Sequence, residues 1–266
     1  MSVRPATILL AVSVAFASRN TAAAARLTPE ASSAFDHYIE RVEAELNRPG
    51  PYLWLDVSPQ DKAAARRGDV VVKPVVALDN GQPFDVPNGQ IQDWQGAIFI
   101  PGVKLERVSK ALLNYGRYPE FYKPEVVQAR LLSGQGGNRH VFLRLYRKDL
   151  LTVVLDTEYA VEYRNDGPGR MHTVSRSTKI SEVKHPGRGG GVDLPPGEGF
   201  GFLWRLNSYW HFEETPDGVF ATCRAVSLSR DIPFGFGWML RDFLDRFPRE
   251  SMAVTLEGTR KAGLAR

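Results

Sequence analysis

The last third of the chain contains the order of elements that most restricts its fold. Residues 200–214 and 219–230 each predict a β-strand, and Thr215-Pro216-Asp217-Gly218 supplies a turn between them. Pro233 and the glycines that follow it then end the strand pattern before a final helix. Two long strands followed by a terminal helix predict a curved antiparallel sheet that grips this helix.

The final helix has one apolar stripe. Its apolar residues recur every three or four positions, at Phe236, Leu240, Phe243 and Phe247. We expect a sheet curved around such a helix to leave an apolar hollow between the two. The sequence therefore predicts a binding site for a hydrophobic small molecule.

Composition is that of a globular protein with one main domain. The chain has 266 residues, of which 43% are hydrophobic and 24% charged, with a net charge of +4. Basic residues alternate with acidic ones, as in Arg241-Asp242 and Asp245-Arg246. Because a nucleic-acid-binding protein gathers its basic residues on one face, we expect no nucleic-acid partner.

Residues 1–25 resemble a secretory signal peptide. Arg4 precedes an uncharged run over residues 6–17, and small alanines fill residues 22–25. The run is too short for an ordinary membrane span, so we expect no transmembrane segment after processing. We predict a periplasmic or secreted protein with a net charge of +2 once Arg4 and Arg19 are removed. A frayed helix of a cytosolic protein is the alternative.

Residues 26–68 predict an N-terminal helical extension packed on the main domain, residues 69–266. Thr28 is suited to cap a helix with Pro29 and Glu30 in its first turn. The apolar stripe of this helix is Phe35, Tyr38, Val42 and Leu46. Pro49-Gly50-Pro51 ends it, and residues 52–68 give no clear pattern.

The main domain alternates strand and helix patterns in an α+β order. Pro74 places the first strand, within residues 69–78, at a sheet edge. A glycine- and proline-rich loop over residues 184–199 is expected at the rim of the sheet. The remaining predicted elements are a strand at 91–100, helices at 105–115 and 119–122, and antiparallel strands at 126–132, 141–147, 152–163 and 171–183.

The segment Gly116-Arg117-Tyr118-Pro119-Glu120-Phe121-Tyr122 resembles the helix-to-helix corner of the helix-grip superfamily. This group includes START lipid-transfer domains, coenzyme Q-binding proteins and polyketide cyclases. The resemblance covers about residues 90–262 and depends mainly on the order of elements. Residues 201–210 and 229–233 resemble an uncharacterised bacterial branch of the group.

The resemblance implies a cavity between the concave sheet and the last helix, occupied in relatives by sterols, lipids, quinones or polyketides. We expect an exported protein that binds or carries a lipid, isoprenoid or similar molecule, a role compatible with transient membrane contact. One alternative is an enzyme that cyclises, dehydrates or hydrolyses a hydrophobic substrate. Another is a protein-interaction module in which the N-terminal helix plugs or covers the pocket.

Strand alternation selects the candidate ligand-binding residues, because every second side chain points to the same face. On the strand at 152–163 this face includes Tyr159. On the strand at 200–214 it includes Trp204, Ser208 and Trp210. Trp238, near the start of the final helix, is a candidate for the entrance, with core packing as its alternative.

Arg176 is the candidate charged anchor. It shares strand parity with Val174 and Ile180, which would place a guanidinium in an apolar interior. Such a charge requires a partner or a ligand carboxylate. The alternative is that a bulge or an edge position lets Arg176 reach water.

A second-choice cluster lies on the other face of the strand at 200–214. It contains Arg205, Asn207 and Tyr209, for which solvent exposure is the simpler interpretation. His211 and Glu213 follow on that face and could share a proton or a metal, but no further ligand stands at a recognisable spacing.

The sequence predicts no catalytic residue, metal or cofactor. Cys223 is the only cysteine, so no disulfide forms within the chain, and the residue is interpreted as a packed thiol. The serines show no nucleophile elbow, and the histidines define no triad.

Overall fold

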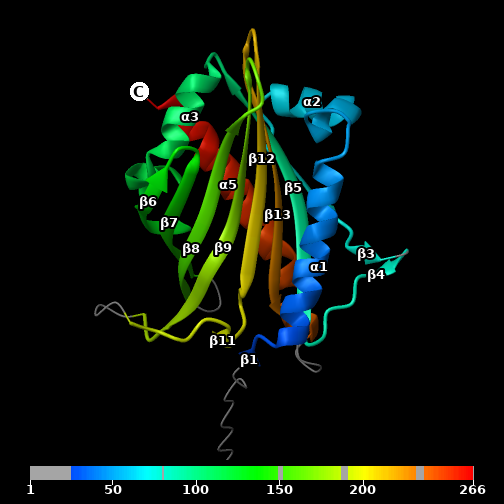
Figure 1. Cartoon of the computed structure of the whole chain (residues 1–266), viewed down its shortest axis with the longest axis vertical. Coiled ribbons are helices and arrows are strands. Elements are labelled where there is room, and N and C mark those ends of the chain that lie inside the picture. Colours follow the sequence, from blue (N-terminus) through cyan, green and yellow to red (C-terminus); the bar gives the residue numbers. More distant parts are fainter. Residues whose placement is uncertain (1–24, 80, 149–151, 187–190, 232–236, 266) are drawn as a thin grey trace, which may run out of the picture.

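The computed structural model describes residues 25–79, 81–148, 152–186, 191–231 and 237–265, with the backbone only over 237–247. Residues 1–24 of the predicted signal peptide and Phe236 lie outside these residues, as do the side chains of Leu240, Phe243 and Phe247. Figure 1 shows a curved sheet with helices on both of its faces.

A nine-stranded antiparallel sheet forms the centre of the fold. Its main path runs in the order β2-β5-β13-β12-β9-β8-β7-β6, and β10 pairs with β9. The strands are β2 (Val71–Val75), β5 (Gly89–Pro101), β6 (Val126–Gln135), β7 (Asn138–Lys148), β8 (Thr152–Asn165), β9 (Arg170–Lys184), β10 (Val192–Asp193), β12 (Arg205–Thr215) and β13 (Gly218–Arg230). Two short pairs are β1 (Ala25–Arg26) with β11 (Glu198–Gly199), and β3 (Leu78–Asp79) with β4 (Gln82–Pro83).

The helices surround this sheet. They are α1 (Pro29–Leu46), η1 (Trp54–Val57), α2 (Pro59–Arg66), α3 (Leu105–Leu113), η2 (Tyr115–Arg117), α4 (Tyr118–Phe121) and α5 (Gly237–Leu264). The predicted cap of α1 is confirmed, since Thr28 Oγ1 accepts a hydrogen bond from the Ala31 amide at 3.2 Å. Of the helices in the described part of the chain, none has both the length and the apolar character of a membrane span.

The two edges of the sheet differ. β2 forms one edge, which confirms the position expected from Pro74. β6 forms the other edge and is mostly exposed, including Leu131 and Leu132. Its pairing with β7 is interrupted by two register shifts, at Val126/Gln128 and at Leu131/Ser133.

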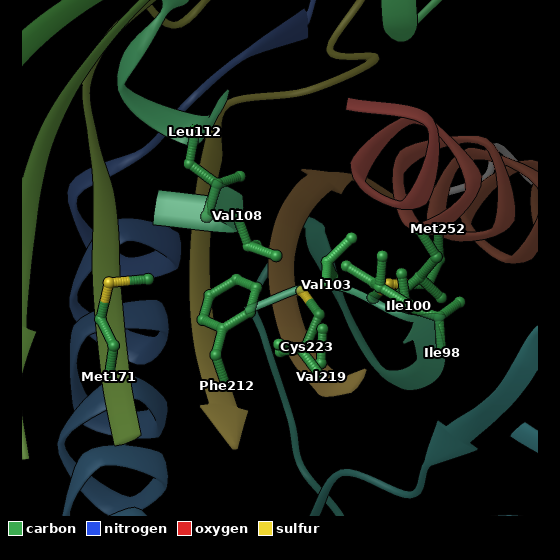
Figure 2. Close-up of a cluster of buried hydrophobic side chains, with 12 residues drawn as sticks. Ile98, Ile100, Val103, Val108, Leu112, Met171, Phe212, Val219, Cys223 and Met252 are labelled. Carbon is green, nitrogen blue, oxygen red and sulfur yellow. The ribbon is translucent and has the colours of Figure 1, made fainter. Parts of the chain in front are cut away.

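α5 packs on the concave face of the sheet, as the order of elements predicted. Gly96 of β5 permits a close approach, because a Cβ atom there would lie 2.5 Å from Leu256 Cδ1 of α5. Figure 2 shows the core that results, with Phe212 and Cys223 on the sheet, Val108 and Leu112 on α3, and Met252 on α5. This core, which we call the concave core, joins α3 and α5 to the strands.

α1 covers the convex face of the same sheet, so it does not plug the concave side. Its buried stripe of Phe35, Tyr38, Ile39 and Val42 contacts Val226 and Leu228 of β13. Beyond the end of α1, Leu53, Leu55 and Ala65 pack on the convex-face residues Ala97, Phe99 and Phe220. Residues 52–68, whose pattern is unclear in the sequence, thus form η1 and α2 over the upper part of the sheet in Figure 1.

A buried ion pair fastens α1 to the sheet. Tyr38 Oη donates to Asp93 Oδ2 at 2.8 Å, and Arg224 Nη2 donates to the same oxygen at 2.7 Å. Arg224 Nη1 also reaches Glu45 Oε2 of α1 at 2.9 Å. Burial raises the pKa of Asp93, an effect that the hydrogen bonds and charge of Arg224 oppose. The pair is therefore stable only while both partners are present.

A second contact between the extension and the sheet joins Tyr52 to a pair of histidines through Asp166. His172 and His211 lie opposite each other on β9 and β12, with ring centroids 5.7 Å apart. Asp166 Oδ2 accepts hydrogen bonds from Tyr52 Oη and is bonded to His172 Nδ1, each at 2.7 Å. Burial lowers the pKa of His211, and the charge of His172 lowers it further.

The strand predicted over residues 200–214 begins later, at Arg205. Gly201 has φ = 76°, and a Cβ atom there would lie 2.8 Å from Arg230 Cβ. The chain therefore turns at this glycine, and residues 200–204 do not follow the alternation of the strand.

We predict that Asp93→Ala lowers the free energy of unfolding by about 3–5 kcal/mol, because it leaves the Arg224 guanidinium largely buried and without this carboxylate. Chemical denaturation measures the change. The matched control is Asp79→Ala, which removes an exposed ion pair between Arg41 of α1 and β3 and should cost less than about 1 kcal/mol. Equal losses in the two variants would contradict the assigned role of the buried pair.

We also predict that His211 makes a contribution to stability that is lost as the pH falls from 7.5 to 5, and that His211→Phe removes this contribution. The unfolded state takes up a proton at the ordinary histidine pKa of about 6.5, whereas the folded state resists protonation of His211. The contribution of the neutral His211 side chain to stability is thus complete above the unfolded-state pKa and decreases as the pH drops below that value. Melting temperatures across this range provide the measurement. Parallel curves for the two proteins would contradict the prediction.

Candidate functional site

A cavity of about 360 Å³ lies between the concave face of the sheet and helices α3 to α5. Residues from β5, β7, β8, β9, β12 and β13 line one side, and Met252, Thr255 and Thr259 of α5 lie opposite. Leu112, Phe212 and Cys223 belong both to this lining and to the concave core. The core therefore forms one wall of the cavity, and the gripped helix does not fill the whole interior.

Aromatic side chains form much of the lining. Trp210 stacks on Phe212 with ring centroids 5.7 Å apart and an angle of 5° between the rings. The other aromatic residues of the lining are Trp94, Tyr115, Tyr118, Tyr122, Tyr146, Tyr159, Tyr163 and Phe202. Such large, rigid surfaces suit an apolar molecule.

Several tyrosine hydroxyls are bonded to the protein itself. The Tyr115 and Tyr163 hydroxyls lie 2.8 Å apart, and Tyr118 Oη donates to the Leu112 carbonyl at 2.7 Å. Tyr122 Oη lies 3.2 Å from Thr259 Oγ1 of α5. Burial raises the pKa of Tyr122 and of Tyr159 to about 12, so both are neutral at physiological pH. These tyrosines therefore present aromatic rings to a ligand rather than charged groups.

Among the described residues, the charged side chains that line the cavity are Glu125 and Arg147, which form an ion pair with each other. Arg147 Nη1 donates to Glu125 Oε1 at 2.9 Å, and Arg147 Nη2 donates to Glu250. Ser251 Oγ of α5 also donates to Glu125 Oε1, at 2.8 Å. Burial raises the pKa of Glu125, although Ser251 and Arg147 oppose the shift.

Three serines lie on neighbouring strands of the cavity floor. Ser175 is on β9, Ser208 on β12 and Ser227 on β13, and all three line the cavity. Within the described residues, none of their side-chain hydroxyls makes a hydrogen bond to the protein. We call Ser175, Ser208 and Ser227 the serine band.

The structure brings three of the sequence-predicted residues to this cavity. Tyr159, Ser208 and Trp210 all belong to the lining, because β8 and β12 alternate as expected. Their contact with a ligand stays a prediction. The side chain of Trp238 lies outside the described residues.

Arg176 does not line the cavity, and the expected interior position is wrong. Thr173 and Ser175 of β9 face the cavity, whereas Arg176 reaches Glu43 of α1 at 2.8 Å on the convex side. An extra residue, Thr178, interrupts the pairing of β9 with β8. This bulge reverses the alternation, so Arg176 and Ile180 lie on opposite faces despite their equal parity.

Trp204 also lies on the convex side, contrary to expectation. It packs in the cluster that contains Phe35 of α1 and Leu228 of β13. The reason is its position before the first residue of β12, where strand alternation does not apply.

The second-choice residues Arg205, Asn207 and Tyr209 contact or face α1, neither the cavity nor open solvent. Arg205 Nη2 donates to Asp36 at 2.9 Å, and Tyr209 Oη donates to Glu43 at 2.9 Å. Asn207 is 2% exposed between them on β12. Arg205 and Tyr209 therefore help to hold the extension on the sheet.

His211 and Glu213, which the sequence suggested could share a proton or a metal, each contact other side chains. Glu213 accepts hydrogen bonds from Arg170, the shorter at 2.6 Å, while His211 contacts the rings of Tyr52 and His172. The residues that the structure describes contain no group of three or more His, Cys, Asp or Glu side chains placed to hold a metal ion.

Apart from Tyr159, the lining tyrosines were missed by the sequence analysis, and so was the Glu125–Arg147 pair. Tyr118 and Tyr122 stand in the corner segment 116–122, where their spacing of four residues was a usable signal of a common face. Glu125 and Arg147 meet only because β6 and β7 pair, which their separation in sequence did not reveal.

No family model matches the sequence, and no curated protein matches it. Solved structures do resemble it. A STAR-related lipid transfer protein from Xanthomonas axonopodis is 17% identical with a TM-score of 0.47, over 67% of this chain and 95% of that chain. An aromatase/cyclase from Streptomyces is 10% identical with a TM-score of 0.45, over 65% and 94%. A human lipid transfer and protein localization domain is 11% identical with a TM-score of 0.44, over 80% and 98%.

These likenesses are remote, and the fold is identified from the chain's own elements. The structure has a curved antiparallel sheet, the short helices α3 and α4 after β5, and a long C-terminal helix on the concave face. The protein has an α+β helix-grip fold.

Proposed function

We propose that this protein binds or carries a hydrophobic small molecule, such as a lipid or an isoprenoid, in the cavity between the sheet and α5. The observation that supports this most strongly is the cavity of about 360 Å³ with its mainly aromatic and aliphatic lining. Ligand pockets typically measure about 300–1,000 Å³ and have mostly apolar walls with a few polar groups.

The energetics favour binding. Burying about a dozen ligand methylenes at ~0.8 kcal/mol each stabilises a complex by on the order of 10 kcal/mol before association costs. Since α1, η1 and α2 pack on the convex face, the ligand does not have to displace the N-terminal extension. The interaction module with a plugged pocket is therefore the weaker alternative.

An enzyme acting on a hydrophobic substrate is the second candidate. Glu125 is a largely buried carboxyl in the cavity lining whose pKa is raised by burial, as suits a proton donor or acceptor. Its ion pair with Arg147 and its hydrogen bond from Ser251 instead suit a structural link between β6, β7 and α5. We give the carrier role precedence for this reason.

Native mass spectrometry of protein purified from its own host should detect a bound hydrophobic molecule, which organic extraction then recovers. Ala225→Phe should abolish this binding without loss of stability, because Ala225 lines the cavity. Ala160→Phe, at an exposed position of β8, is the matched control and should retain the molecule.

Ligand-free protein that also takes up no fluorescent fatty acid or sterol would refute the carrier proposal. A recovered molecule that the protein returns chemically altered after incubation would favour the enzyme. Unaltered return supports the carrier.

We further propose export through the signal-like residues 1–25, supported by a basic residue, an uncharged run and small alanines in the order of a signal peptide. The N-terminal sequence of the protein isolated from its native host should begin near residue 26. An intact Met1 in the isolated protein would refute export.

A further inference from the structure

The serine band offers hydroxyls that make no hydrogen bond within the described residues, in a cavity whose lining is mainly apolar. Ser208 lies directly opposite Ser175 in the pairing of β12 with β9. Ser227 lies opposite Leu206, which is two residues from Ser208 on β12. Directly opposite side chains have Cβ atoms about 5 Å apart, and diagonal ones about 7–8 Å. One polar group of a ligand can therefore contact two of these hydroxyls together.

Hydroxyls in such a position require a partner. Polar groups removed from water without a hydrogen bond destabilise a structure, so an empty cavity holds water at this place and a filled one favours a ligand oxygen. A serine hydroxyl both donates and accepts. The band thus suits a hydroxyl, which needs both functions, and a carbonyl, which needs only donors.

The charges around the cavity disfavour an acidic ligand. The guanidinium of Arg147 is shared between the carboxylates of Glu125 and Glu250, so these three side chains together carry excess negative charge when ionised. Arg176, the cation expected inside, lies on the convex face beside Glu43 and Glu162. A ligand carboxylate would find no comparable uncommitted cation among the described lining residues.

We propose that the cavity selects hydrophobic molecules with an uncharged oxygen group, an alcohol, ketone or ester, over the carboxylic acid of equal chain length, and that Ser175, Ser208 and Ser227 determine this selectivity. This inference rests on the proposed binding function. It adds the chemical class of the ligand and the residues that recognise it.

The test measures displacement of the neutral dye N-phenyl-1-naphthylamine from the full chain by dodecane, dodecan-1-ol, methyl dodecanoate and dodecanoate at pH 8. The wild-type protein should bind the alcohol and the ester more tightly than the acid. Replacing all three serines of the band by alanine should weaken alcohol binding about 3- to 10-fold, the effect of losing one or two hydrogen bonds, and leave dodecane within twofold. Ser208→Ala alone should give part of this loss if the triple variant folds poorly.

The matched control is Ser133→Ala on the exposed edge strand β6, which should change neither affinity. Equal alcohol affinity in the wild type and a folded serine variant, or acid binding as tight as alcohol binding, would overturn the inference while the binding function stands. If the wild type binds the dye but the serine variants lose dodecane and alcohol equally, the band shapes the cavity only and the inference also fails. A wild type that binds neither dye nor any of the four molecules would refute the proposed function itself, and the inference with it.

Discussion

The sheet of this protein is stabilised from its convex side as well as by the concave core, and the convex support allows part of the concave side to stay open. α1 places a continuous apolar stripe on β12 and β13, and the buried Asp93–Arg224 pair connects this helix to two strands. Burial of apolar surface is the main source of folding stability. Because much of the apolar surface of the sheet is buried beneath the extension, α5 and the sheet can enclose a partly unfilled interior without loss of the fold.

Strand alternation divides the two tasks among neighbouring residues. Tyr209 of β12 faces α1, whereas Ser208 and Trp210 face the cavity. A change of one residue in register would exchange these faces and bring polar groups that bond α1 into the hollow. The long pairing of β12 with β13, from Arg205 to Thr215, specifies the register and so keeps the recognition surface separate from the supporting one.

Local patterns in the sequence predicted most elements, including the cap at Thr28, the edge position of Pro74 and the hairpin before the final helix. They also placed Tyr159, Ser208 and Trp210 on the cavity side. Two kinds of information were missing. The bulge at Thr178 depends on how β9 pairs with β8, and the burial of Arg205, Asn207 and Tyr209 depends on a helix more than 150 residues away.

The irregular edge strand β6 has a consequence for the behaviour of the protein in solution. An exposed edge with apolar side chains such as Leu131 and Leu132 is a template on which a second sheet can grow. The two register shifts of β6 interrupt its outer row of amide and carbonyl groups, so an incoming strand would find bonding partners over short stretches only. The opposite edge is protected by proline at position 74, which has no amide hydrogen to donate. Both edges of the sheet therefore resist the addition of strands from other protein molecules.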